Sequence, residues 1–283
     1  MHRKVTSLRA PFLKRLAVEP ERVAGREGYP FDLPVIRGGL DITFETPVTV
    51  IVGENGTGKS TILEAIAEAA GFGAAGGSKN HTLADDTTER HRDLIFEDFD
   101  EASRPARSRH LAKTRLDPRL TDALRCSWLP KVGQGFFFRA ETFHRLARYL
   151  DEAAFTGLRL EVPPEHLKMS HAEGFIDFFS MRFENARRSR RPHLFIFDEP
   201  ESALSPKRQV DFIRMLRDLT SDGLAQVIIA SHSPVLMAYP GCSLLRLTRG
   251  GAEPCALRET EHFQLLRAFY ADPEGFLAAY LES

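Results

Sequence analysis

The strongest chemical signal in the sequence is the stretch at residues 53–61, which reads Gly-Glu-Asn-Gly-Thr-Gly-Lys-Ser-Thr. It matches the pattern G-x-x-x-x-G-K-[ST] at every fixed position, and loops of this kind cradle nucleotide phosphates. Lys59 can reach the β- and γ-phosphates, and the Ser60 hydroxyl can ligate Mg²⁺. Further phosphate contacts are expected from the neighbouring loop residues Glu54, Asn55, Gly56, Thr57, Gly58 and Thr61.

The elements on either side of this stretch suit that role. Residues 48–52 are an apolar, β-branched run that predicts a buried strand, and residues 60–70 predict a helix. A strand, a glycine-rich turn and a helix N-terminus together aim backbone N–H groups and the positive end of a helix dipole at one point. The glycines let the loop curl closely around phosphate oxygens.

A second signal is the acidic pair Asp198 and Glu199, which ends the apolar run at residues 193–197. Such a continuous apolar run is typical of a central parallel strand. It would deliver Asp198 to the phosphate end of the sheet, where the carboxylate can hold Mg²⁺ together with Ser60. Glu199, one residue further on, can reach the water that attacks a γ-phosphate. Positioning, charge neutralisation and a polarised nucleophile are what phosphoryl transfer needs.

A third signal follows the next buried strand, predicted at residues 225–230. His232 comes directly after this strand's end, where it can contact a γ-phosphate or orient water. The sequence therefore predicts a site that hydrolyses a nucleoside triphosphate, with Glu199, His232 and Lys59 as catalytic residues.

The remaining elements indicate how these residues are positioned. Alternating patterns predict strands at residues 12–18 and 40–44, before the loop. Phenylalanines at helical spacing between residues 172 and 186 predict a helix with one buried face. Residues 206–220 predict a helix with Val210, Ile213, Met215 and Leu216 on its apolar side, and residues 244–247 resemble an edge strand before two short helices. Strands alternating with helices imply an α/β fold with a mainly parallel sheet.

With these motifs in this order, the chain resembles the ABC-type ATPase superfamily of P-loop NTPases from Val48 to about Leu247. Residues 202–205, Ser-Ala-Leu-Ser, look like that family's D-loop, although Glu201 stands where transporter subunits usually have threonine. Residues 169–173, Met-Ser-His-Ala-Glu, resemble its signature motif, with Ser170 kept and Ala172 in place of glycine. The resemblance is closest to stand-alone, soluble members related to the SMC and RecF-type ATPases, which are often named AAA-family ATPases.

The resemblance carries several implications. It implies a single ABC-type ATPase domain over residues 1–283, with an antiparallel N-terminal β region and a small helical subdomain in an insert at about residues 80–185. It implies a homodimer that sandwiches ATP, in which Ser170 acts on nucleotide bound by the partner, and a methyl group at Ala172 is expected to weaken that dimer. By position, Glu141 is nearest the expected Q-loop ligand of Mg²⁺. Tyr29 is a candidate for stacking on adenine, with local packing an equal alternative.

Composition narrows the function further. The chain has 283 residues, 42% hydrophobic and 27% charged, with a net charge of −1. The chain as a whole therefore lacks the excess of positive charge that would attract nucleic acid or an acidic membrane. Three widely separated cysteines, Cys126, Cys242 and Cys255, favour neither a disulfide framework nor a zinc site. No stretch approaches the roughly 20 apolar residues of a membrane span, so a cytoplasmic protein without direct membrane insertion is expected.

The sequence leaves the biological output open among three classes. Arginine runs at residues 104–109 and 187–191 are compatible with a nucleic-acid-linked ATPase in repair or defence, although solvated loops and turns are the simpler interpretation. The alternatives are a nucleotide-binding subunit of a membrane transporter and a nucleotide-gated module that controls a separate effector. ATP and Mg²⁺ are the expected cofactors in all three.

Overall fold

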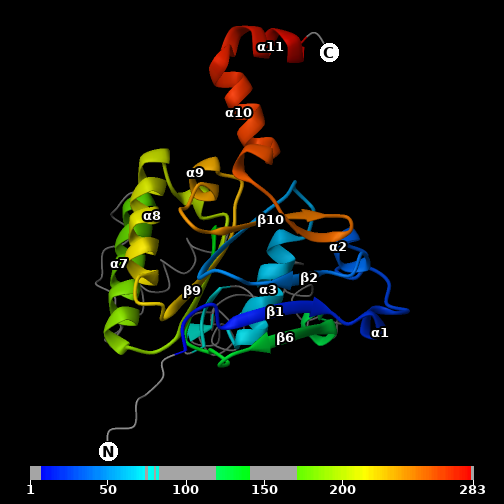
Figure 1. Cartoon of the computed structure of the whole chain (residues 1–283), viewed down its shortest axis with the longest axis vertical. Helices are drawn as coiled ribbons and strands as arrows, with labels where there is room; N and C mark the ends of the chain where they lie inside the picture. The colour runs from blue at the N-terminus through cyan, green and yellow to red at the C-terminus, as the bar shows by residue number, and fades with distance from the viewer. Residues whose placement is uncertain (1–7, 74–75, 80, 83–118, 141–170, 282–283) are drawn as a thin grey trace, which may run out of the picture.

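A computed structural model describes residues 8–73, 76–79, 81–82, 119–140 and 171–281 (Figure 1). Within these residues the strands are β1 (Leu13–Val18), β2 (Asp41–Thr43), β3 (Val48–Val52), β4 (Gly77–Ser78), β5 (His81–Thr82), β6 (Leu124–Trp128), β7 (Gly135–Arg139), β8 (His193–Asp198), β9 (Ala225–Ala230), β10 (Ser243–Thr248) and β11 (Gly251–Pro254). The α-helices are α1 (Pro20–Val23), α2 (Pro34–Arg37), α3 (Lys59–Ala70), α7 (His171–Ser189), α8 (Pro206–Thr220), α9 (Pro234–Met237), α10 (Glu261–Ala271) and α11 (Pro273–Leu281).

The larger sheet has the strand order β11-β10-β3-β9-β8-β7-β4-β5 among the described residues. The five strands from β10 to β7 run parallel to one another, and antiparallel strands flank them on both sides. The α/β fold with a mainly parallel central sheet is therefore confirmed. Strand β9 lies between β3 and β8, so the carboxyl ends of these three strands share one edge of the sheet.

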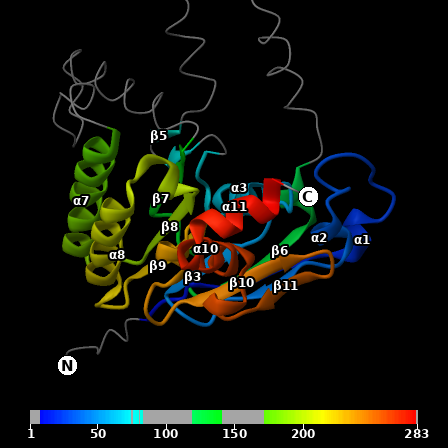
Figure 2. The ribbon, with the colours of Figure 1, turned by 90° about the horizontal axis from the view of Figure 1, so that it is seen from above.

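Both faces of the central strands are buried, and β8 shows how. Leu194 and Ile196 pack into a core that includes α3, whereas Phe195 and Phe197 pack into a second core that includes α7 and α8. Successive strand residues point to opposite faces, so an unbroken apolar run is what a sheet covered on both faces requires. Figures 1 and 2 show α7 and α8 on one side of the sheet and α3 on the other.

The phenylalanine stripe of α7 lies in the second core, as the helical spacing predicted. Phe175, Phe178, Phe179 and Phe183 are all at most 4% exposed. Phe179 makes edge-type contacts with rings on β7 and β8, and its centroid lies 5.0 Å from that of Phe197. Edge-to-face aromatic pairs of this kind stabilise a core beyond their buried area, so α7 is held firmly against the strand that carries Asp198.

The N-terminal strands β1 and β2 pair antiparallel, as expected, in a separate sheet of order β2-β1-β6. Its third strand, β6, was not expected, because it lies within the insert predicted at about residues 80–185. The apolar face of this sheet packs into the same core as α3. Gln226, fully buried on β9, accepts hydrogen bonds from the backbone N–H groups of Phe12 and Leu13 at 2.7 and 2.8 Å and donates to the Leu13 carbonyl. This side chain joins the N-terminal sheet to the central one.

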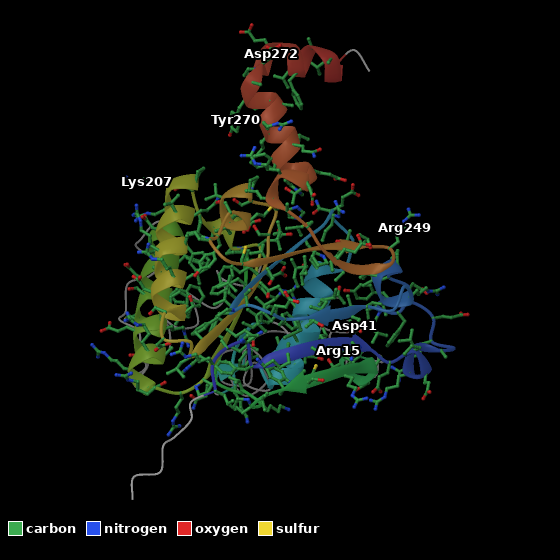
Figure 3. The ribbon with its side chains drawn as sticks, in the orientation of Figure 1. Arg15, Asp41, Lys207, Arg249, Tyr270 and Asp272 are labelled. Atoms are coloured by element: carbon green, nitrogen blue, oxygen red, sulfur yellow. The ribbon has the colours of Figure 1, made fainter. Side chains whose placement is uncertain are left out.

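The C-terminal helices α10 and α11 project away from the body of the molecule (Figure 1). Helix α10 has no buried residue. Tyr270, which is 73% exposed, and Asp272 lie near the bend between the two helices, far from the Arg15–Asp41 ion pair on the N-terminal sheet (Figure 3). We refer to α10 and α11 as the C-terminal arm.

Two sequence predictions about elements are wrong in detail. The strand at residues 244–247 is not an edge strand, because β10 pairs with β3 on one side and with β11 on the other. Helix α8 buries Phe212, Leu216 and Leu219 but leaves Val210 41% exposed. The helical insert predicted at about residues 80–185 and the arginine run at residues 104–109 fall largely or wholly outside the described residues.

Candidate functional site

The glycine-rich loop lies where the sequence predicts it, between the fully buried strand β3 and helix α3. Gly58 precedes the helix with a φ of +99°, and a Cβ atom there would lie 3.1 Å from Leu33 and 3.3 Å from Val35. Glycine is therefore required at this turn for both its conformation and its lack of a side chain. The loop is thereby set to present the first N–H groups of α3, which have no partner within the helix.

Lys59 is 4% exposed, and its ammonium donates to the carbonyls of Gly53 and Glu54 at 2.8 and 3.0 Å. Burial lowers the pKa of Lys59, and this is partly offset by the carboxylates of Glu199, Asp198 and Glu201, which raise it. The ammonium thus lies inside the curve of the loop, beside the acidic residues that end β8.

Ser60 and Asp198 meet as predicted, since the serine hydroxyl donates to Asp198 Oδ1 at 3.1 Å. The other carboxylate oxygen of Asp198 lies 3.8 Å from Nε of Arg139 at the end of β7. Arg139 also forms an ion pair with Glu64 on α3. Burial raises the pKa of Glu64, and the neighbouring Arg139 lowers it. The sequence analysis missed Arg139, whose only signal is its place at the end of a buried strand.

Glu199 and His232 come together at the ends of β8 and β9, with 3.5 Å between Glu199 Oε1 and His232 Nε2. Glu199 adopts a left-handed backbone conformation with a φ of 50°, which is rare for a residue with a side chain and concentrates at functional sites. Burial lowers the pKa of His232, as do Lys59 and His262, whereas Glu199 raises it. The imidazole is therefore neutral at neutral pH.

Glu201 holds the turn that carries His232. Its Oε1 accepts a hydrogen bond from the His232 backbone N–H at 2.5 Å. Its Oε2 is buried. Burial raises the pKa of Glu201, and the hydrogen bond from His232 lowers it. Glu201 is thus a structural link between the ends of β8 and β9. Its sequence position had indicated only a departure from transporter subunits.

His262, in the first turn of α10, is a site residue that the sequence analysis did not identify. Its Nε2 lies 2.7 Å from Nδ1 of His232, and the two ring centroids are 4.7 Å apart. The two residues are 30 positions apart, and no local pattern around His262 indicates the contact.

Tyr29 lies beside the loop, as its proposed role requires. Its hydroxyl forms a 2.7 Å hydrogen bond with Thr61 Oγ1, and the residue is 71% exposed. A cavity of about 440 Å³ adjoins the loop, lined by loop residues from Gly53 to Thr57, by the start of α2, by the end of β10 with Arg249, and by residues 260–262. Tyr29 is not among the residues that line this cavity, so its role in adenine stacking stays a prediction. Ser170 and Glu141 lie outside the described residues.

Together these features define the class of protein. A phosphate-binding loop joins a buried parallel strand to a helix, its serine meets an aspartate from β8, and a glutamate and a histidine end the neighbouring strands. An antiparallel N-terminal sheet covers the loop helix. These features are those of a P-loop nucleotide-binding domain, and their arrangement resembles that of the ABC- and SMC-like ATPases.

Comparison with known proteins agrees with this class. Residues 33–115 match a family model described as "AAA domain", and residues 186–238 match one described as "AAA domain, putative AbiEii toxin, Type IV TA system". A curated relative, the ribose import ATP-binding protein RbsA of Hahella chejuensis, is 23% identical over 226 residues. That match covers 77% of this chain but only 40% of the relative.

Two solved structures align with most of the chain at low sequence identity. The SMC head domain from Thermotoga maritima is 19% identical with a TM-score of 0.43, and the match covers 86% of this chain and 98% of that one. The cbiO1 protein from Clostridium perfringens, part of an ABC transporter complex, is 14% identical with a TM-score of 0.42, over 95% of this chain and 99% of that one.

Proposed function

We propose that this chain is a cytoplasmic, Mg²⁺-dependent ATPase that binds ATP on the loop at residues 53–61 and hydrolyses it to ADP and phosphate. The observation that carries the proposal is the 3.1 Å contact between Ser60 Oγ and Asp198 Oδ1, with Glu199 and His232 beside it. None of the described helices is both long and apolar enough to cross a membrane.

The donor set fits Mg²⁺. A hydroxyl and a carboxylate oxygen are hard ligands, and Mg²⁺ in phosphate sites usually takes one or two protein ligands and completes its shell with water and phosphate oxygens. No cluster of three or more acidic, histidine or cysteine ligands occurs among the described residues, which suits an ion held jointly with a nucleotide. When bound, Mg²⁺ would neutralise charge on the β- and γ-phosphates.

The residues of the site then have separate roles in binding and hydrolysis. The N–H groups of the loop and the Lys59 ammonium hold the phosphates, which requires the ammonium to release the Gly53 and Glu54 carbonyls. Glu199, whose side chain is 43% exposed, accepts a hydrogen bond from the attacking water and orients it. His232 Nε2 faces the same space and donates to the γ-phosphate as charge develops.

We further propose that the whole chain acts as one ABC-type domain and forms an ATP-sandwiched homodimer, with Ser170 completing the partner's site and hydrolysis reopening the dimer. The best-supported output is a nucleic-acid-linked or defence process. The AbiEii toxin description of one matching family model favours it. The name of the ribose import relative keeps the transporter subunit as the alternative.

The test uses the variant Glu199→Gln, which should bind ATP without hydrolysing it. With saturating Mg-ATP, light scattering should report a mass twice that of the monomer. The matched control, Lys59→Ala combined with Glu199→Gln, should stay monomeric because it cannot hold ATP. A Glu199→Gln protein that binds ATP but remains monomeric would contradict the dimer. Turnover measured with and without DNA, and co-purification with a membrane protein or a soluble effector, separates the three outputs.

A further inference from the structure

His262 lies at the base of the C-terminal arm and contacts the site histidine directly. Its Nε2 is 2.7 Å from Nδ1 of His232, so one of these two nitrogens carries the shared proton. Thr260 caps the first turn of α10: it is 2% exposed, donates to the Leu257 carbonyl and accepts from the Phe263 N–H. Leu257, just before the cap, packs against the second core. His262 is thus presented at a defined place, although the rest of the helix is exposed.

The surroundings of His232 decide which nitrogen is the donor. Its Nε2 is buried, makes no hydrogen bond within the described part of the chain, and faces Glu199 Oε1 at 3.5 Å. The γ-phosphate proposed to bind here would also offer only acceptor oxygens. Because both neighbours are acceptors, Nε2 must carry a proton to interact favourably with either.

In the chain without nucleotide, the charge state of His232 then limits it to one proton. The titratable groups that face it are Lys59, Glu199 and His262, with Glu201 on its backbone N–H. Burial and the nearby Lys59 lower its pKa, so the ring is neutral at neutral pH. A neutral imidazole has one N–H. If Nε2 holds it, Nδ1 is an acceptor, and His262 Nε2 must be the donor.

We propose that His262 is a positioning residue for hydrolysis: by donating Nε2–H to Nδ1 of His232, it holds His232 in the tautomer that points its own Nε2–H at the attacked phosphate. The inference rests on the proposed ATPase function and deepens it. It also makes the base of the C-terminal arm a part of the site. In proteins, the hydrogen bond made by one ring nitrogen of a histidine commonly decides whether the other ring nitrogen carries the proton.

The kinetic test compares two substitutions of His262. In His262→Phe the ring remains and the donor is lost; in His262→Gln the amide nitrogen can take the place of Nε2. Losing one ordinary hydrogen bond should lower kcat of the Phe variant about five-fold. The Gln variant should recover to within about two-fold of wild type, because an amide N–H restores the donor. The dissociation constant for ATP, measured with a fluorescent ATP analogue, should be the same in all three proteins, because His262 acts through His232.

Three kinetic results would overturn the inference. Wild-type kcat in His262→Phe would show that the contact does not matter. Equal loss of kcat in the Phe and Gln variants would indicate a packing role. Weaker ATP binding with unchanged kcat would indicate that His262, which also lines the cavity beside the loop, contacts the nucleotide instead.

A second readout does not depend on turnover. In protein labelled with ¹⁵N-histidine, two-bond ¹H–¹⁵N correlations report the tautomer of each ring, and the His232 signal is assigned by its loss in His232→Gln. The inference predicts the Nε2–H tautomer in wild type and a mixture of tautomers in His262→Phe. An Nδ1–H tautomer in wild type overturns it. If the wild-type protein fails to hydrolyse ATP, the proposed function fails, while this measurement still decides whether His262 sets the tautomer of His232.

Discussion

The left-handed backbone of Glu199 predicts that this residue lowers the stability of the protein. Its φ and ψ are 50° and 52°, a conformation that costs a residue with a side chain about 1–2 kcal/mol. Hydrogen bonds made by its backbone hold it there: its N–H donates to the Ala230 carbonyl at 3.0 Å, and its carbonyl accepts from the N–H and hydroxyl of Ser202. These bonds do not involve the side chain, so they persist in any variant.

Replacing Glu199 by glycine should remove the conformational cost. Glycine loses about 0.4–1 kcal/mol more on folding because its unfolded chain is freer, which leaves a net gain of about 0.5–1 kcal/mol. The correct reference is Glu199→Gln, which removes the same charge beside Lys59 and keeps a side chain. Asparagine tolerates the left-handed region better than other residues, so Glu199→Asn should lie between the two.

The assay is urea unfolding of the three variants without nucleotide, with phosphate release measured beside it. The expected order of the free energy of unfolding is Gly above Asn above Gln, and thermal unfolding of the same variants should show a shift in Tm of about 2 °C between the extremes. All three should have lost hydrolysis. If Glu199→Gly is no more stable than Glu199→Gln, the backbone at this position is not strained, and the argument from its conformation is refuted.

Three other predictions concern buried polar groups. Gln226→Leu should lower the free energy of unfolding by about 3 kcal/mol or more, because it leaves the Phe12 and Leu13 backbone groups buried and unpaired; urea unfolding checks this, and a loss below about 1 kcal/mol would contradict it. Glu201→Gln should be more stable than wild type at pH 8, because burial raises the pKa of Glu201 and its ionised form therefore lowers the free energy of unfolding. This difference in stability should vanish as the pH falls below 4.5, the ordinary pKa of the carboxyl group. A difference in stability that grows as the pH falls would contradict a raised pKa. Because burial lowers the pKa of His232, turnover between pH 7 and 9 should show no titration of this residue, and its protonation should reduce turnover only below its ordinary pKa of 6.5; a pH–rate profile with a histidine step above 7 would exclude the assignment.

Much of the site could be predicted because its residues are tied to strong local patterns. The spacing of glycines, lysine and serine in residues 53–61 allows few structures, and the apolar runs before Asp198 and His232 place both at the ends of buried parallel strands. Parallel strands bring their carboxyl ends to one edge of a sheet, so the contact between Ser60 and Asp198 across 138 positions followed from the order of elements alone.

The errors and omissions have a different origin. The sequence predicts an edge strand at residues 244–247, but the short strand β11 at Gly251–Pro254 folds back on them, and its polar sequence gave no sign of pairing. His262 contacts His232 because the fold brings the first turn of α10 beside the end of β9, 30 positions away in the sequence. Arg139 reaches Asp198 and Glu64 through the pairing of β7 with β8. Each contact depends on tertiary packing, which leaves no periodic trace in the sequence.

The most direct test of the central claim, that Glu199 makes this loop a hydrolytic site, is phosphate release from saturating Mg-ATP by wild type and Glu199→Gln, with ATP binding measured on the same samples. We expect steady release by wild type, equal binding by both proteins, and at least about a hundred-fold slower release by the variant. Release by Glu199→Gln at the wild-type rate would contradict it.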